Sequence, residues 1–199
     1  MPLTDKQKKG TAEMRAFLCG LPPSNTVESV DQRARLPDPA HVPTDVTVRV
    51  EIAPPSLHPH PLLEGSALKT PERVPVYFYA LHSDQAESEV ADTHVIFFIH
   101  GGGNVVGHPT QEPFIQCFAQ LLRAVAARSG NASKCVLVAP CYRLATVPEN
   151  TFPAALQDVL AAYQYVLGKG YKASNIVPTG DSAGGNHGRS THSLVCTGD

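Results

Sequence analysis

The chain alternates between short apolar runs and longer segments in which apolar residues recur at helical spacing. Residues 45–52 alternate apolar and polar side chains, which predicts a strand with one buried face. Residues 74–81 predict a second strand. Residues 95–99 are apolar throughout, as in a strand of a parallel sheet that helices cover on both faces.

Two segments between the predicted strands favour helices. The first begins at Glu112, with a proline tolerated in its first turn, and ends at Gly130. Its apolar face consists of Phe114, Ile115, Phe118, Leu121, Leu122 and Val125. The second begins near Pro153, ends at residues 168–170 and has Leu156, Val159, Leu160, Tyr163 and Leu167 on one face. With strands at 135–139 and 175–177, the alternation predicts a doubly wound α/β sheet.

A Gly-x-Ser-x-Gly pattern follows the last predicted strand, at Gly180, Ser182 and Gly184. At this spacing the serine occupies a sharp turn from strand to helix, with its hydroxyl above the sheet edge, and the glycines let neighbouring backbones pass. The backbone N–H of Ala183 then points to the place where an oxyanion would form. Asp181 projects to another side of the turn and is not expected to be a catalytic acid. Alone, the pattern also fits an ordinary loop.

A second motif follows the apolar run at 95–99 and consists of His100 and the glycines Gly101, Gly102 and Gly103. Three glycines after a strand expose a row of backbone N–H groups with no side chains in the way. Such a row can supply the other donors of an oxyanion hole. A flexible turn is the alternative for this motif alone, but two such motifs at two strand ends favour a catalytic site.

Together with two further segments, these motifs resemble the hormone-sensitive-lipase-like branch of the α/β hydrolases. The resemblance covers residues 70–186 and rests on His100–Gly103, Tyr142–Ala145, Phe152–Leu156 with Asp158, and Gly180–Gly185. It implies a three-layer α/β fold with a central, mostly parallel sheet, and the hydrolysis of small-molecule carboxylic esters without a cofactor. It also implies site roles: Ser182 as nucleophile, Gly101, Gly102, Gly103 and Ala183 as oxyanion donors, and His100, Gly180, Asp181 and Gly184 as supporting positions.

The resemblance divides the chain into three expected parts. Residues 1–43, with a short helix at 12–19, form a loop-rich, cap-like segment, and residues 44–186 form the N-terminal half of a hydrolase core. Residues 187–199 lie outside the family pattern. Segment 187–193 has no apolar stripe, and its glycine and hydroxyl residues oppose a helix.

The residues after the nucleophile depart most from the family. In this fold the triad acid and histidine follow the serine along the chain, but only residues 183–199 follow Ser182. We therefore expect a core that is incomplete after the elbow, and a chain that is inactive or crippled as a hydrolase. On a helix leaving the elbow, His187 and His192 would point along the helix and not over the hydroxyl, so neither is expected to act as the base. Pro178 removes one sheet donor just before the elbow.

The composition of the chain limits which binding partners and which cellular compartment we expect. The chain is 42% hydrophobic and 17% charged, which indicates a globular domain, and its net charge of −2 comes without the basic stripe that nucleic acid requires. Its apolar runs are too short to span a bilayer or to form a signal peptide. Five cysteines without paired spacing indicate reduced thiols and a cytoplasmic protein. His58 and His60 lack partners at ligand spacing, so no metal is expected. Oligomeric state stays open.

Other readings of the glycine-rich segments remain. The run from Gly180 to Gly185 is also found in chymotrypsin-like proteases, but those are all-β proteins. No lysine follows the glycines, so a phosphate-binding P-loop is not supported. A non-catalytic, small-molecule-binding relative, as in the gibberellin receptors that resemble this branch, is the principal alternative function. A fragment from a faulty gene prediction is the other.

Overall fold

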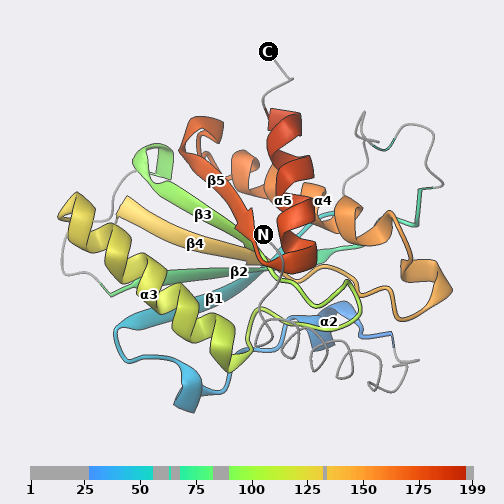
Figure 1. Cartoon of the computed structure of the whole chain (residues 1–199), viewed down its shortest axis with the longest axis horizontal. Helices are drawn as coiled ribbons and strands as arrows, with labels where there is room; N and C mark the ends of the chain where they lie inside the picture. Colours follow the sequence, from blue (N-terminus) through green and yellow to red (C-terminus); the bar gives the residue numbers. More distant parts are fainter. Residues whose placement is uncertain (1–26, 56–62, 64–67, 83–89, 132–133, 196–199) are drawn as a thin grey trace, which may run out of the picture.

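The fold is built on one five-stranded mixed sheet. The computed structural model describes residues 27–55, 63, 68–82, 90–131 and 134–195. Within them the strand order is β1-β2-β4-β3-β5 (Figure 1). β1 pairs antiparallel with β2 and β2 with β4, whereas β3 runs parallel to both β4 and β5. The strands are β1 Val46–Ala53, β2 Val74–Leu81, β3 His94–Ile99, β4 Cys135–Pro140 and β5 Ile176–Gly180.

Helices cover both faces of this sheet, which gives three layers (Figure 1). On one face, α3 packs Ile115, Phe118 and Leu122 against tyrosine, phenylalanine and leucine side chains of β2, β3 and β4. The other face is covered by α4 and α5. The helices are α2 Val30–Arg33, α3 Glu112–Ser129, α4 Ala154–Gly168 and α5 Ser182–Val195. Short 3-10 turns occupy Pro39–His41, Val90–Asp92, Pro148–Asn150 and Ala173–Asn175.

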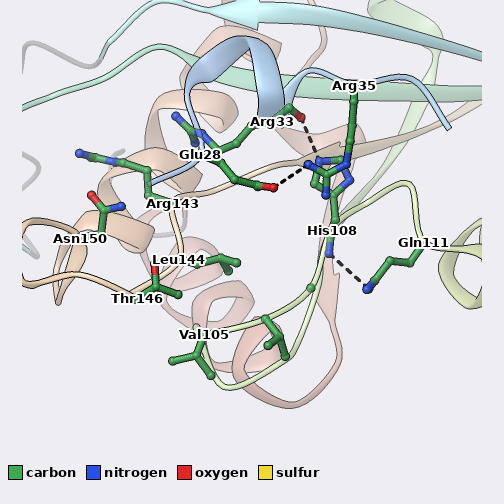
Figure 2. A pocket seen from close by; sticks show the side chains of 12 residues that line it. Glu28, Arg33, Arg35, Val105, His108, Gln111, Arg143, Leu144, Thr146 and Asn150 are labelled. Carbon is green, nitrogen blue, oxygen red and sulfur yellow. Dashed lines mark hydrogen bonds and ion pairs between the residues drawn. The ribbon is translucent and has the colours of Figure 1, made fainter. Parts of the chain in front are cut away.

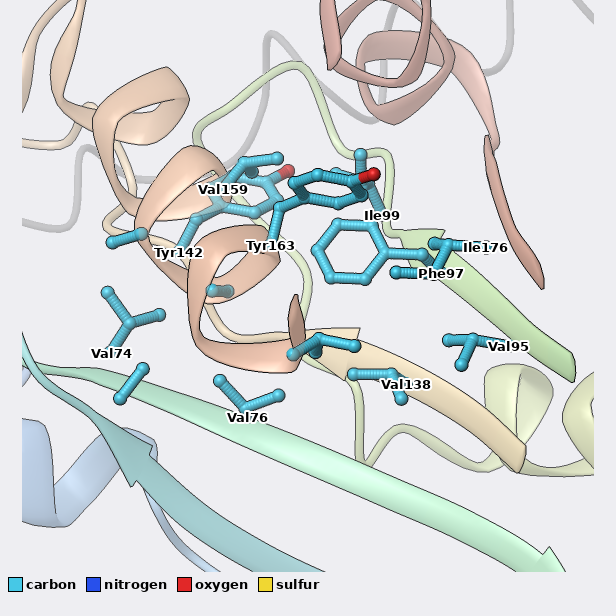
Figure 3. Packing of buried hydrophobic residues seen from close by; sticks show 14 of the residues in the cluster. Val74, Val76, Val95, Phe97, Ile99, Val138, Tyr142, Val159, Tyr163 and Ile176 are labelled. Carbon is cyan, nitrogen blue, oxygen red and sulfur yellow. The ribbon is translucent and has the colours of Figure 1, made fainter. Parts of the chain in front are cut away.

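The apolar runs of the sequence become the two faces of the core. Figure 3 shows the α4 side, where the Tyr163 ring meets Phe97 edge-on with centroids 5.7 Å apart, beside Val159 and Val138. β4 is buried along its whole length, as expected for a strand with neighbours on both sides and helices on both faces. The predicted strands and the two predicted core helices are confirmed, and so is the three-layer α/β class. The helix expected at 12–19 and the histidines at 58 and 60 lie outside the described residues.

One element corrects the sequence prediction. Segment 187–193 was expected not to be helical, but α5 runs without a break from Ser182 to Val195. α5 packs on β5 and β3, and its small residues let it lie close to them. A Cβ on Gly184 would overlap the carbonyl group of Ile99 at the end of β3. Tertiary packing therefore outweighs the weak helix propensity of glycine, serine and threonine.

β5 forms one edge of the described sheet, because among the described residues it pairs only with β3. This explains how Pro178 is tolerated, since an edge strand has one side without a sheet partner. Val177 in the same strand is 61% exposed. The opposite edge strand, β1, carries the ion pair between Arg49 and Glu51, whereas β5 carries no charged side chain.

A buried ion-pair cluster ties the N-terminal segment to the core. The carboxylate of Asp158, on α4, accepts hydrogen bonds from the guanidinium and the backbone N–H of Arg143 at 2.8–3.1 Å. Arg33 of α2 reaches the same carboxylate at 3.5 Å and Glu72 at 3.2 Å. The side chains of Arg33, Arg143 and Asp158 are all at most 3% exposed. The cluster therefore fixes α2 against α4 and against the segment that follows β4.

Candidate active site

Ser182 lies at the turn from β5 to α5 in a conformation that L-residues rarely adopt. Its φ is 48°, in the left-handed region, which costs of order 1–3 kcal/mol and persists only where the surroundings impose it. A Cβ at Gly180 would overlap the Ile99 carbonyl oxygen and lie 2.7 Å from the carbonyl carbon of Gly184. Both glycines of the motif are thus required by close backbone contacts, and the serine is left at the start of a helix.

The segment from His100 to Asn104, here called the glycine loop, leaves β3 at the same edge of the sheet. β3 and β5 are parallel neighbours, with Ile99 opposite Gly180, so their carboxyl ends bring the loop and the elbow together. Gly102 has a φ of 101° and Gly103 a φ of 62°. Within the described chain the amides of these two glycines have no hydrogen-bond acceptor. Ala183, in the first turn of α5, has no intrahelical acceptor for its amide either.

The amide of Gly101 has a different role from the one predicted. It donates to Asp181 Oδ1 at 2.7 Å, so it is not free for an oxyanion. A side chain at Gly101 would overlap the Asp181 carboxylate. Asp181 therefore joins the elbow to the glycine loop, in keeping with the expectation that it is no triad acid, and Gly102 and Gly103 are the loop glycines with amides left over.

The buried side chain of His100, which is 1% exposed, packs beneath the glycine loop on its core side. Its ring stacks on Tyr142 with centroids 4.2 Å apart, and its Nδ1 donates to the Gly101 carbonyl at 2.9 Å. Burial lowers the pKa of His100 to about 4, so the imidazole is neutral at pH 7. The Tyr142 hydroxyl donates to the His100 carbonyl at 2.8 Å. These contacts give His100 a structural role, as the sequence suggested.

His187 faces the glycine loop and not the nucleophile. Its Nε2 lies 2.8 Å from Asn104 Oδ1, an acceptor, so Nε2 carries the proton. Burial lowers the pKa of His187, which keeps it neutral. In the described part of the chain no histidine hydrogen-bonds the Ser182 hydroxyl. The backbone of His192 belongs to α5, and its side chain lies outside the described atoms.

Three contributors to this region were assigned no role from the sequence. Tyr142 was recognised only as part of a motif, and Asn104 and Arg33 were not singled out. Asn104 has a φ of 63°, and a polar residue that tolerates the left-handed region directly after three glycines is the one signal that could have marked it. Arg33 carries no local signal, because its partners lie 39 to 125 residues away.

A cavity of about 260 Å³ lies between α2, the loop after β4 and residues 105–108, which follow the glycine loop (Figure 2). Its lining combines apolar Val105, Val106 and Leu144 with polar groups from Arg35 and Asn150. Figure 2 shows His108 beside it, with Nε2 donating to the Arg33 carbonyl at 3.0 Å. Burial, and then the charge of Arg35, lower the pKa of His108 to about 4.

The described residues form neither a metal site nor a membrane-spanning helix. None of their histidine, cysteine, aspartate and glutamate side chains forms a group of three or more that could hold a metal ion. None of their helices is long and apolar enough to cross a membrane.

Known proteins with similar sequences include esterases and lipases. Residues 96–191 match a family described by the α/β-hydrolase fold. The chain is 32% identical over 93 residues to an acetyl-hydrolase of Streptomyces hygroscopicus, covering 47% of this chain and 27% of that protein. It is 37% identical over 91 residues to the carboxylesterase/phospholipase LipF of Mycobacterium tuberculosis, covering 46% and 21%. Lipase 2 of a Moraxella strain is 34% identical over 111 residues, covering 54% and 23%.

Solved structures show the same fold. An ester hydrolase from the metagenome of Lake Arreo aligns with a TM-score of 0.51 at 22% identity, covering 98% of this chain and 54% of its own. Carboxyl esterase 2 of the fungus Tuber melanosporum aligns with a TM-score of 0.50 at 22% identity, covering 90% and 49%. The chain thus spans about a quarter of the curated relatives above and about half of these structures.

Proposed function

We propose that this chain, which has the α/β-hydrolase fold and resembles esterases and lipases, is a crippled hydrolase of carboxylic esters in which Ser182 is the nucleophile. One observation carries the proposal: a strained serine at a helix start adjoins a glycine loop with unused amides. Backbone strain of this kind clusters at functional sites.

In the proposed reaction, Ser182 Oγ forms a bond to the ester carbonyl carbon and its proton passes to water, because no histidine among the described residues hydrogen-bonds this hydroxyl. The negative charge develops on the carbonyl oxygen, where the amides of Gly102, Gly103 and Ala183 donate hydrogen bonds. Loss of one such donor typically costs about 2.7–4 kcal/mol of transition-state stabilisation. Collapse of the intermediate expels the alcohol, and water then hydrolyses the acyl-enzyme. We assign His187 no part in proton transfer, because neither of its ring nitrogens hydrogen-bonds the Ser182 hydroxyl.

The cavity beside the glycine loop is our candidate for the part of the ester remote from the reacting carbonyl. Val105 and Val106, which directly follow the glycine loop, line it together with Leu144. Its volume of about 260 Å³ suits a small substituent.

We further propose that residues 1–43 act as a cap-like segment, since Arg33 and Arg35 contribute to the same lining. The free thiols of Cys117, Cys135 and Cys141 fit a cytoplasmic location.

The test is covalent labelling of Ser182 by a fluorophosphonate in the 199-residue chain, with hydrolysis of p-nitrophenyl acetate measured beside it. We expect labelling that is abolished in Ser182→Ala and that an ester substrate slows by competition. A folded wild-type chain that is not labelled would contradict the proposal. If that chain still bound small esters, the non-catalytic, ligand-binding alternative would replace it.

A further inference from the structure

The glycine loop is held at both of its ends, and the two glycines with unused amides lie between. At the first end, Asp181 accepts the Gly101 N–H at 2.7 Å. At the other end, the Asn104 carbonyl accepts the Ala145 N–H at 2.6 Å and the Asn104 side chain meets His187 Nε2 at 2.8 Å. The position of Gly102 and Gly103 relative to the elbow is therefore set by these contacts.

The second end needs such a contact more than the first. Asn104 holds a left-handed φ of 63°, which a residue other than glycine keeps only when its surroundings fix it. Its side chain and its carbonyl both have partners, and those partners come from different elements: α5 for the side chain, and the loop after β4 for the carbonyl. If the hydrogen bond from α5 is removed, the strained Asn104 keeps only one of its two restraints, the bond at its carbonyl.

His187 is itself held in one orientation. Its ring meets the Tyr142 ring edge-on, with centroids 5.6 Å apart and planes at 61°. The Tyr142 hydroxyl in turn donates to the His100 and Gly101 carbonyls at 2.8 and 3.3 Å. A single imidazole on α5 therefore touches both the side chain that ends the loop and the ring that supports its beginning.

We propose that His187 is a positioning residue for ester hydrolysis, which fixes the far end of the glycine loop through Asn104 and so holds the Gly102 and Gly103 amides over the elbow. This inference rests on the proposed function. It gives His187 a role through its hydrogen bond to the loop, and none as the base. Small displacements of such donors matter, because an error of about 1 Å can cost about a hundredfold in rate.

The experiment uses the 199-residue chain and four variants: His187→Leu, His187→Gln, Asn104→Ala and the double variant Asn104→Ala with His187→Leu. Glutamine keeps an N–H donor at nearly the same reach as Nε2, so it serves as the conservative rescue. Arg189→Ala, an exposed change on the same helix, is the control for general effects on α5. Two quantities are measured: the fluorophosphonate labelling rate of Ser182, and the amide NMR signals of Gly102 and Gly103.

We expect His187→Leu and Asn104→Ala each to slow labelling about tenfold, the effect of losing roughly one buried hydrogen bond. Both changes should shift the two glycine amide signals. The double variant should be no slower than either single one, because the same contact is lost, and His187→Gln and Arg189→Ala should stay within about threefold of the wild type. Unchanged glycine signals in His187→Leu, or effects that multiply in the double variant, would overturn the inference.

The two proposals fail in different ways. If the folded wild-type chain is not labelled at all, the proposal of ester hydrolysis is rejected. The amide NMR signals of the two glycines then still decide whether His187 positions the loop. If His187→Leu does not fold, the His187→Gln and Asn104→Ala variants decide it by the same signals. A wild type that is labelled, with His187→Leu and Asn104→Ala labelled equally fast, rejects the positioning role alone.

Discussion

At the scale of single residues, close backbone contacts determine where glycine is needed around the elbow. Gly184 and Gly188 occupy the same helix, one turn apart, yet only Gly184 has a backbone carbonyl in the space that a Cβ would take. At Gly188 the nearest atoms, of Thr179, lie 3.8 Å from that position, which is ordinary contact. The two glycines therefore have opposite consequences when replaced.

We predict that Gly184→Ala destabilises the protein by about 1–3 kcal/mol, because the new methyl group overlaps the carbonyl of Ile99 and the backbone must move. Gly188→Ala should instead stabilise it by about 0.5–1 kcal/mol, since alanine favours the helix. Urea unfolding followed by circular dichroism gives both values. Equal effects of the two substitutions would show that the packing of α5 on β3 is not as described.

At the scale of elements, the buried ion pairs link α2 and α4 to the ends of the strands. Asp158 and Glu72 each contact both Arg33 and Arg143, and the side chain of Asp158 is 2% exposed whereas that of Glu72 is 37% exposed. Each guanidinium is at most 3% exposed, so each depends on these two carboxylates for compensation of its charge. Buried pairs of this kind contribute little compared with an apolar core, but breaking one is costly.

We expect Asp158→Ala to lower the free energy of unfolding by about 3–5 kcal/mol, because it removes the buried partner of two buried guanidiniums and leaves them only the more exposed Glu72. The matched control is Asp45→Ala, which breaks the ion pair of Asp45 with Arg123 at the surface, where both side chains are 46% exposed. Solvent screens that pair, so its loss should have a much smaller effect. Similar losses of stability for the two variants would rule out a central role for the buried cluster.

Elements also show where sequence reasoning succeeds and where it stops. The strands and both core helices follow from local apolar patterns, and the two motifs lie at the ends of β3 and β5 because local turn chemistry places them there. The bond from Gly101 to Asp181 spans 80 residues, and that from Asn104 to His187 spans 83. Such contacts depend on the register of β3 against β5, which no local pattern specifies. The sequence prediction for α5 was wrong for a related reason, since packing on the sheet, and not local helix propensity, determines that this segment is helical.

At the scale of the whole molecule, the two edges of the described sheet differ in chemistry. β1 presents charged Arg49 and Glu51, which discourage pairing with another chain. β5 presents no charged residue, and Val177 is 61% exposed. An apolar edge of this kind is a site for association between molecules.

We predict that Val177→Lys reduces aggregation of the 199-residue chain on heating, because a lysine on an edge strand opposes pairing between molecules. Static light scattering during a temperature ramp provides the measurement. Val177→Thr keeps strand propensity without adding charge, so its scattering should stay near that of the wild type. Lysine and threonine variants that scatter alike would place the association surface elsewhere.

The parallel pairing of β3 with β5 also has a kinetic consequence. The glycine loop and the elbow are synthesised about 80 residues apart, with α3, β4 and α4 between them, and they meet only once Ile99 lies opposite Gly180. Long-range pairing of this kind forms late during folding, because the chain must close a large loop first. Reactivity of Ser182 would therefore be among the last properties acquired by a newly made molecule, and its appearance would time the docking of the fifth strand.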